Sequence, residues 1–280
     1  MKALSYRIAG RASYGLLVHG VVHEATRVFR ERHEDLRAVL RGGALALLPE
    51  NLEARGIAEA DVEYLPLIPR PDKVICVGVN YRPHAEEMGR PLPEHPLLFV
   101  RFADSQVGHR QALIYPELST HYDYEGELAV IIGKPARHVR HAEAFDVIAG
   151  YACFMDGSVR DWQQHSSQFT AGKNFWRSGA LGPWLVTRDE IPDPASLTLC
   201  TRVNGELLQE GRLTDLIFDI PTLVAYCSSF AELLPGDVLV TGTPGGVGAA
   251  RQPPRWLAPG DCIEIDLGEV GALCNTVGTG

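Results

Sequence analysis

Three acidic residues stand at alternate positions just ahead of an apolar run near the middle of the chain. Residues 123–133 read DYEGELAVIIG, so Asp123, Glu125 and Glu127 precede five apolar residues and a closing glycine. Apolar and β-branched residues favour a strand, in which alternate side chains point to the same face. Three carboxylates on one face repel each other and resist burial. A divalent cation would relieve both problems, and carboxylate oxygens favour Mg²⁺, Mn²⁺ or Ca²⁺.

The alternative for this stretch is a solvated strand face, because most carboxylates in proteins are exposed. The apolar second half of the stretch favours burial instead. Asp156 is a candidate for a further metal ligand, since it ends the apolar run 151–155 and precedes a glycine, where a strand is expected to meet a loop. Glu125, Glu127 and Asp156 are therefore the predicted metal ligands.

A second group of reactive side chains follows the apolar run 73–79. Pro83 suits the first turn of a helix, which places His84 and Glu87 three positions apart on one face. A carboxylate that holds an imidazole fixes its tautomer and raises its basicity, as a general base requires. An incidental pair in a surface turn is the alternative that this segment leaves open.

A lysine lies in the loop-like segment 171–184, among glycine and aromatic residues. Lys173 would either meet an anionic substrate or stay exposed, and composition does not choose between the two. Arg160 follows Asp156 closely and is expected to form structural ion pairs. The glycine-rich turn after the apolar run 238–240 lacks both common nucleotide-binding motifs, although its backbone N–H groups suit a carboxylate.

The composition of the whole chain excludes several classes of function. The 280 residues are 45% hydrophobic and 22% charged, as in an ordinary globular protein, and the net charge of −9 gives no basic footprint for nucleic acid. No apolar run approaches the ~20 residues that cross a bilayer. The start of the sequence lacks a secretory signal, and the six scattered cysteines form no C-x-x-C pair. We therefore expect a cytoplasmic protein without nucleic-acid or membrane partners.

The predicted elements divide the chain at a proline-studded extended segment, residues 65–72. We expect a small N-terminal domain over 1–70 and a catalytic domain over 71–280. The patterns predict helices over residues 31–40, 51–60, 142–150 and 220–230, and a β-hairpin that turns at Asn204-Gly205. Because helices do not alternate regularly with strands, a doubly wound sheet is disfavoured.

Seven segments together resemble the fumarylacetoacetate hydrolase superfamily and occur in its order over residues 73–280. They are residues 78–88, 123–134, 156–163, 172–173, 181–184, 203–206 and 241–248. The resemblance implies an α+β, predominantly β fold, with a catalytic domain of mixed β-sheets and a small N-terminal domain. It further implies a homodimer that acts on a small-molecule keto acid.

The same resemblance implies roles for individual residues. Glu125, Glu127 and Asp156 would hold Mg²⁺ or Mn²⁺, with Ca²⁺ as a substitute in crystals. His84 and Glu87 would form a water-activating dyad on a mobile lid. The substrate would be surrounded by these residues: Lys173, Gln163, Arg160, Tyr81, Thr241, Gly242 and Thr243.

The sequence departs from the family pattern at two places near these residues. Many members carry an aspartate three positions after the lysine, where this chain has Trp176, so the expected charge partner of Lys173 is absent from that position. Members often read Asn-Asp-Val-Ser where this chain has Met155, Asp156, Gly157 and Ser158. Both departures are expected to reshape the substrate pocket.

Three functions are compatible with these residues. The first is hydrolysis of the C–C bond of a 2,4-dioxo acid, such as fumarylpyruvate or maleylpyruvate, in which His84 and Glu87 activate water and Lys173 helps hold the enolate charge. The second keeps the enolate but decarboxylates a β-keto acid of the oxaloacetate type, or isomerises a dienoic keto acid. The third is a family member that binds metal or dicarboxylate without catalysis.

Overall fold

The N-terminal part of the chain is an antiparallel sheet with two short helices. The computed structural model describes residues 1–87 and 92–280, without the side chains of His84 and Ala85. The first elements are β1 (Lys2–Ile8), β2 (Arg11–Val18), β3 (Val21–Ala25), α1 (Arg27–Arg32), α2 (Leu36–Arg41), β4 (Leu52–Ala58) and β5 (Glu63–Tyr64). The two helices begin at side-chain caps, Thr26 and Asp35.

The helix predicted for residues 51–60 is wrong, because this segment forms β4. Its residues pair with β3 in register, Ile57 opposite Val22 and Leu52 opposite Ala25. A ladder formed with a distant strand outweighs the weak local helix preference of the segment. The predicted helix 31–40 is found as the end of α1 and most of α2.

The N-terminal strands continue into one large twisted sheet. Its order is β4-β3-β2-β1-β14-β12-β11-β17-β6-β7, and the join is the antiparallel pair of β1 with β14. The remaining members of this path are β6 (Val74–Gly78), β7 (Leu97–Arg101), β11 (Gly126–Ile132), β12 (Ile148–Met155), β14 (Gly179–Thr187) and β17 (Val238–Val240). This one sheet contains strands from both sides of residue 70, so the proposed division into two domains stays a prediction.

Over the residues that the structure describes, two smaller sheets and four further α-helices complete the fold. A five-stranded sheet has the order β16-β15-β18-β19-β9, and β10 pairs with β13. The bounds are α3 (Arg82–Glu87), β8 (Gln106–Val107), β9 (Leu113–Ile114), β10 (Tyr122–Asp123), β13 (Ser158–Val159), α4 (Arg160–Gln163), α5 (Thr170–Lys173), β15 (Thr198–Val203), β16 (Glu206–Arg212), α6 (Ile220–Phe230), β18 (Cys262–Asp266) and β19 (Ala272–Gly278). The predominantly β class is confirmed. The hairpin of β15 and β16 and the helix α6 also match the prediction.

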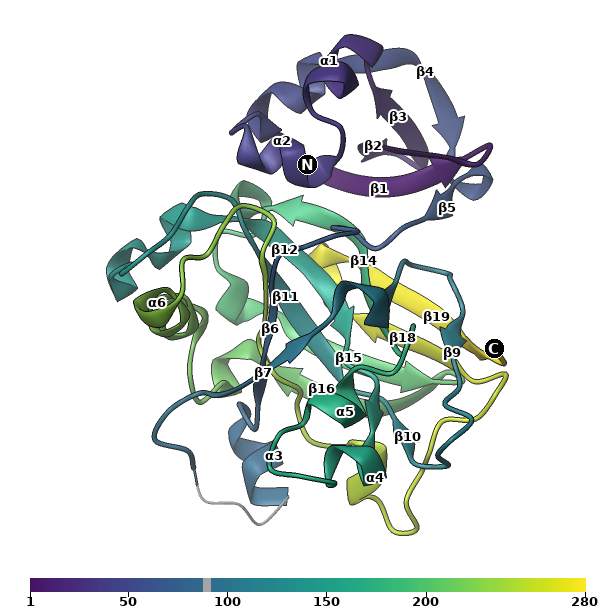
Figure 1. Ribbon diagram of the computed structural model, residues 1–280, viewed down its shortest axis with the longest axis vertical. Coiled ribbons are helices and arrows are strands. Elements are labelled where there is room, and N and C mark those ends of the chain that lie inside the picture. Colours follow the sequence, from purple (N-terminus) through teal and green to yellow (C-terminus); the bar gives the residue numbers. More distant parts are fainter. Residues whose placement is uncertain (88–91) are drawn as a thin grey trace.

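The main core lies between the large sheet and the five-stranded sheet. β11 is buried along its whole length, as its continuous apolar sequence predicts. The helix predicted for 142–150 is instead a 3-10 turn, His141–Val147, followed by the start of β12. In Figure 1 the N-terminal strands lie at one end of the long axis, and α3, α4 and α5 lie near the other end. Among the described residues, no helix is long and apolar enough to cross a membrane.

A buried histidine gives a stability prediction. His109 is 5% exposed, and its Nδ1 accepts the Cys274 backbone N–H at 3.0 Å. Burial, and then Arg110, lower the pKa of His109 from 6.5 to about 4. Between these values the unfolded chain binds a proton that the folded chain does not, so the free energy of unfolding falls as the pH falls. We expect this group to remove about 3 kcal/mol across that window.

The measurement is urea denaturation of the wild type and His109→Asn from neutral pH down to about pH 4. Asparagine keeps an acceptor for the Cys274 amide but does not titrate. The wild type should lose more stability than the variant over this range. Parallel curves for the two proteins would show that His109 is not protonated on unfolding.

Candidate active site

Two neighbouring strands bring three carboxylates together. Glu125 and Glu127 flank the first residue of β11, and Asp156 directly follows the last residue of β12. The strands are antiparallel with Gly126 opposite Met155, so the start of one meets the end of the other. The Asp156 N–H also donates to the Glu125 carbonyl at 2.9 Å. One oxygen from each carboxylate lies within 4.8 Å of the others, and all three residues are buried. The predicted convergence is therefore found.

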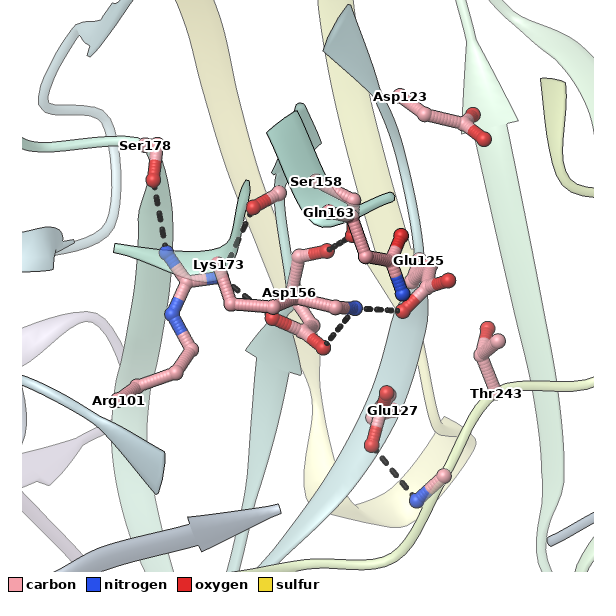
Figure 2. A network of polar contacts seen from close by, with 12 residues as sticks. Arg101, Asp123, Glu125, Glu127, Asp156, Ser158, Gln163, Lys173, Ser178 and Thr243 are labelled. Carbon is pink, nitrogen blue, oxygen red and sulfur yellow. Dashed lines mark hydrogen bonds and ion pairs between the residues drawn. The ribbon is translucent and has the colours of Figure 1, made fainter. Parts of the chain in front are cut away.

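Asp123 does not share the face of the two glutamates, contrary to the expectation from strand alternation. The alternation is broken because Asp123 belongs to β10, and β11 begins only at Gly126. The Asp123 carboxylate accepts the N–H groups of Gly248 and Ala249 and the Nε–H of Arg160, at 2.8 to 3.0 Å. Figure 2 shows it apart from the other acidic groups. Asp123 therefore holds the glycine-rich turn and does not belong to the cluster of three carboxylates.

Glu127 is the least neutralised of the three carboxylates. Its Oε2 accepts the backbone N–H of Gly242 at 2.6 Å. Burial raises the pKa of Glu127 well above its ordinary value, and the charges of Asp156 and Glu125 raise it further. Lys173 and the Gly242 N–H act in the opposite direction but do not cancel these effects. A buried anion of this kind gains strongly from a nearby cation.

Lys173 lies between two of the carboxylates. Its Nζ donates to Glu125 Oε2 and to Asp156 Oδ2, both at 2.6 Å, and the side chain is 2% exposed (Figure 2). Burial alone would lower the pKa of Lys173, but Asp156 and Glu125 raise it on balance, so the amine is held as an ammonium. The ammonium also lies 4.8 Å from the centre of the Phe99 ring. The exposed alternative for this lysine is therefore wrong.

Two arginines hold the outer sides of the same carboxylates. Arg101, fully buried, donates to Asp156, to the Gly157 carbonyl and to the Ser178 hydroxyl. Arg160 donates from Nη2 to Glu125 at 2.5 Å and from Nη1 to Gln163 Oε1 at 3.0 Å. Arg160 thus forms the structural ion pairs expected from the sequence. These contacts fix the orientation of each carboxylate plane.

The carboxylates fit a hard divalent cation. Carboxylate oxygens are the ligands that Mg²⁺ and Mn²⁺ prefer, and each oxygen has two acceptor positions. The ion pairs with Lys173, Arg101 and Arg160 therefore leave Glu125 and Asp156 able to accept a further contact. Glu127 lies beside Glu125 and Asp156, and none of its described partners is a cationic side chain. The donor set and its burial suit a site that gains a dication.

A small cavity opens beside this group. Its volume is about 60 Å³, and its lining consists of Val77, Gly78, Val79, Phe99, Glu125, Glu127, Arg160, Gln163, Phe169, Lys173 and Thr243. Of the predicted substrate contacts, Gln163, Arg160, Lys173 and Thr243 reach this cavity. Tyr81, Thr241 and Gly242 do not line it: Tyr81 is fully buried in the main core, and the N–H groups of Thr241 and Gly242 bind Leu128 and Glu127.

The predicted His84–Glu87 pair lies on α3, next to the glycine-rich turn. The Glu87 carboxylate accepts the Gly246 N–H, at 3.1 Å to one oxygen and 3.2 Å to the other. The helical backbone predicted after Pro83 is present. The His84 side chain lies outside the described residues, so the dyad remains a prediction. The contact at Gly246 brings α3 to the same turn whose Gly242 N–H holds Glu127.

The two departures from the family pattern have different consequences. Trp176 is 59% exposed and lies beside the Arg177 guanidinium, while Lys173 takes Glu125 and Asp156 as charge partners. The expected lack of a charge partner for Lys173 is therefore wrong. At Gly157, an added Cβ would lie 1.7 Å from the Ser178 carbonyl oxygen, so this close approach admits only glycine.

Sequence reasoning missed Arg101. The residue ends the apolar strand β7 just as Asp156 follows β12, so a charge at the end of a buried strand was an available signal. Its partner lies 55 positions away, and no local pattern links the two. Only the neighbouring positions of β7, β6, β17, β11 and β12 in the sheet bring the guanidinium toward Asp156.

Known proteins share both the sequence and this fold. Residues 73–278 match the family model described as fumarylacetoacetate (FAA) hydrolase, C-terminal. The human mitochondrial oxaloacetate tautomerase FAHD2A is 40% identical over 251 residues, which cover 89% of this chain and 78% of that protein.

Two solved structures extend the similarity over the whole chain. A fumarylacetoacetate hydrolase from Exiguobacterium antarcticum superposes with a TM-score of 0.87 at 33% identity and covers 100% of both chains. Maleylpyruvate hydrolase from Sphingobium sp. SYK-6, solved with manganese(II) and pyruvate, gives 0.81 at 27% identity, again over 100% of both chains. The family match, the relatives and the placement of the acidic group agree: this chain belongs to the fumarylacetoacetate hydrolase family.

Proposed function

We propose that this protein enolises a small 2-keto acid with the help of a divalent metal, and that keto–enol tautomerisation of oxaloacetate is its best-fitting reaction. The carrying observation is the convergence of Glu125, Glu127 and Asp156 with Lys173 beside a cavity of about 60 Å³. This group of charges suits the carboxylate and keto oxygens of a small 2-keto acid. The human relative named oxaloacetate tautomerase supports the same choice.

The three carboxylates would hold Mg²⁺ or Mn²⁺. When bound, the metal supplies Lewis-acid polarisation of a keto acid, which makes the protons next to the carbonyl easier to remove. The remaining chemistry belongs to the side chains around the cavity. Lys173 brings a fixed positive charge toward the oxygen on which negative charge develops, and the cavity wall of Phe99 and Phe169 keeps water away from it.

A neutral donor, the Gln163 amide, would orient the substrate. The Oε1 of Gln163 accepts a hydrogen bond from Arg160, so the amide N–H groups of Gln163 can donate to the substrate. Thr243 also lines the cavity, in the turn that binds Glu127 through Gly242, and its hydroxyl donates to the Gly126 carbonyl. His84, oriented by Glu87, is our candidate for moving the proton between carbon and oxygen.

Hydrolysis of a 2,4-dioxo acid is the second candidate. It shares an enolate with tautomerisation but forms it later: water first adds to the 4-carbonyl, and cleavage of the C3–C4 bond then leaves the enolate of pyruvate. The similarity to maleylpyruvate hydrolase over both whole chains favours it. It additionally requires His84 to activate a water molecule, which tautomerisation does not.

The test is to incubate the purified protein with oxaloacetate, acetylpyruvate and fumarylpyruvate, each with Mg²⁺, with Mn²⁺ or with a chelator. Accelerated loss of the enol absorbance of oxaloacetate, without release of pyruvate or CO₂, supports tautomerisation. Pyruvate release from the 2,4-dioxo acids supports hydrolysis, and CO₂ release from oxaloacetate supports decarboxylation. If none of the substrates changes in a metal-dependent way, the proposal is overturned in favour of a non-catalytic binding protein.

Replacing His84 by alanine should separate the candidate reactions. We expect hydrolysis to fall by about 10²–10⁴-fold, the usual contribution of a general base. A decarboxylation, which needs no attacking water, should fall less. Both rates are measured on the same preparation with saturating Mn²⁺, and equal losses would argue against water activation by His84.

Two further expectations remain proposals for this chain. We propose a homodimer, which light scattering at several protein concentrations tests directly. We also propose a cytoplasmic location, although the human relative carries a mitochondrial name, and expression of a fluorescent fusion tests it.

A further inference from the structure

A buried glutamine outside the cavity connects the substrate side of the site to the metal side. Gln209 lies on β16 and is 1% exposed. Its Nε2 donates to the Thr243 hydroxyl at 2.8 Å and to the Pro244 carbonyl at 2.9 Å. Its Oε1 accepts the backbone N–H of Gly126 at 3.0 Å. No sequence motif drew attention to this residue, and it does not line the cavity.

Gly126 is the residue between the two glutamates. Its N–H belongs to the peptide unit that joins it to Glu125, and its carbonyl belongs to the unit that joins it to Glu127. Gln209 holds the N–H, and the Thr243 hydroxyl donates to the carbonyl at 2.9 Å. Both peptide units that carry the glutamates are therefore fixed by side chains.

These side chains take the place of a missing strand. β17 pairs with β11 only from Ala129 to Ile131, so the ladder on that side does not reach Gly126. Among the described residues, Gln209 and Thr243 supply the hydrogen-bonding partners of Gly126 on that side, whereas Leu128, two positions further on, accepts the Thr241 backbone N–H. A strand end without such partners frays, and buried backbone groups without partners are costly.

The backbone at Gly126 also lies unusually close to the neighbouring sheet. A Cβ added there would be 2.1 Å from the Thr201 hydroxyl on β15. This close approach lets the short amide of Gln209, from the adjacent strand β16, reach the peptide unit directly. The five-stranded sheet thus acts on the carboxylate pair through a single side chain.

We propose that Gln209 is a positioning residue that sets the spacing of Glu125 and Glu127 and holds Thr243 at the cavity. This inference rests on the proposed function, since it assigns the spacing to metal binding. Groups that orient metal ligands typically change metal affinity by about 10–100-fold when removed. We expect Gln209→Met, which keeps the shape but removes all three hydrogen bonds, to weaken Mn²⁺ binding by that factor.

The experiment compares Mn²⁺ affinity, measured by titration calorimetry on the whole protein, with thermal stability. Asn275→Leu is the matched control: Asn275 is 3% exposed, donates to the carbonyls of Gly108 and Gln111 at 2.8 Å, and lies on β19 away from the carboxylates. Both variants should lose stability. Only Gln209→Met should lose Mn²⁺ affinity, and its kcat should fall more than its KM rises.

A double-mutant cycle tests whether Gln209 and Thr243 act through the same peptide units. The combined loss of Mn²⁺ affinity in Gln209→Met with Thr243→Val should be smaller than the product of the separate losses. Wild-type Mn²⁺ affinity in Gln209→Met would overturn the inference alone. A wild type that binds Mn²⁺ but transforms no keto acid would overturn the proposed reaction and leave the affinity test of Gln209 intact. A wild type that binds no Mn²⁺ would overturn both.

Discussion

Replacing Glu127 by glutamine is expected to stabilise the metal-free protein while it abolishes activity. Glu127 is buried beside two other carboxylates and has a backbone N–H as its described partner. Glutamine keeps an acceptor for the Gly242 N–H but removes a desolvated negative charge from the group. We expect the free energy of unfolding in chelator to rise by about 1 kcal/mol or more, because the like-charge repulsion disappears.

The same substitution removes one ligand from the proposed metal site. We expect Mn²⁺ affinity to fall sharply and the enolisation rate to fall by about 10³-fold, since the metal contributes several kcal/mol to such a reaction. Thermal denaturation with chelator and with Mn²⁺, together with the oxaloacetate assay, measures both effects. If Glu127 were needed only for folding, its replacement would lower the stability and the activity of the protein together.

Asp156→Asn provides the matched control for Glu127→Gln. Asp156 has Arg101 and Lys173 as partners, so its neutralisation leaves two buried cations undercompensated. This variant should lose activity and also lose stability in chelator, by about 3–5 kcal/mol. If Glu127→Gln destabilised the metal-free protein as Asp156→Asn does, the view of Glu127 as an unneutralised ligand would be wrong.

The second large effect is expected at Lys173. Lys173→Met keeps the apolar stem beside Phe99 but removes the ammonium shared by Glu125 and Asp156. Breaking a buried ion pair from one side typically costs about 3–5 kcal/mol, so the chelated variant should unfold at a much lower temperature. Loss of one charged donor to the developing oxyanion should also lower kcat by about 10²–10³-fold.

Metal binding separates the roles of Lys173 and the carboxylates. The Lys173→Met variant should bind Mn²⁺ at least as tightly as the wild type, because one positive charge beside the ligands is gone. Mn²⁺ should then recover more stability in the variant than in the wild type. Lys73→Met is the control, since Lys73 pairs with the buried Asp237 at 2.8 Å outside the site and should leave Mn²⁺ affinity and kcat unchanged. Loss of Mn²⁺ binding in Lys173→Met would show that the lysine builds the metal site.

The charges around the site explain why these predictions differ. Asp123 binds Arg160 beside the group, so counting it with Glu125, Glu127 and Asp156 gives four negative charges against the three positive charges of Arg101, Arg160 and Lys173. Glu127 has no cationic side chain among its described partners, so the excess negative charge lies closest to it. A dication would make the group net positive by one charge. An anionic keto acid would then be attracted to it. The arrangement is suited to binding metal and substrate together.

Local sequence determined several features of this protein. The Asn204-Gly205 turn of the hairpin needs two residues with positive φ, which these two supply at 53° and 83°. The helix α6 begins where Asp219 caps its first turn, and its apolar positions repeat with the helical period. The buried strand β11 follows from five consecutive apolar residues. Each of these depends on interactions within a few positions along the chain.

The candidate site was only partly visible in the same way. Two local signals predicted the metal ligands: Glu125 and Glu127 alternate along a strand, and Asp156 follows an apolar run. The fold brings these three residues together. Asp123 obeyed the same alternation, yet the break between β10 and β11 turned it toward Gly248 and Arg160. Sequence pattern cannot reveal that the expected strand is interrupted at residues 124 and 125, between β10 and β11.

The tertiary structure alone decided which distant groups meet. Residues 52–58 became a strand because β3 offered them a ladder, and Arg101 reached Asp156 across 55 positions. Gln209 reached Gly126 across 83 positions. Turns, caps and apolar periods reflect the conformational preferences of neighbouring residues, which the sequence states directly. The pairing of buried charges and amides depends on how whole sheets stack, because a buried polar group takes whichever partner the packed fold places within hydrogen-bonding distance.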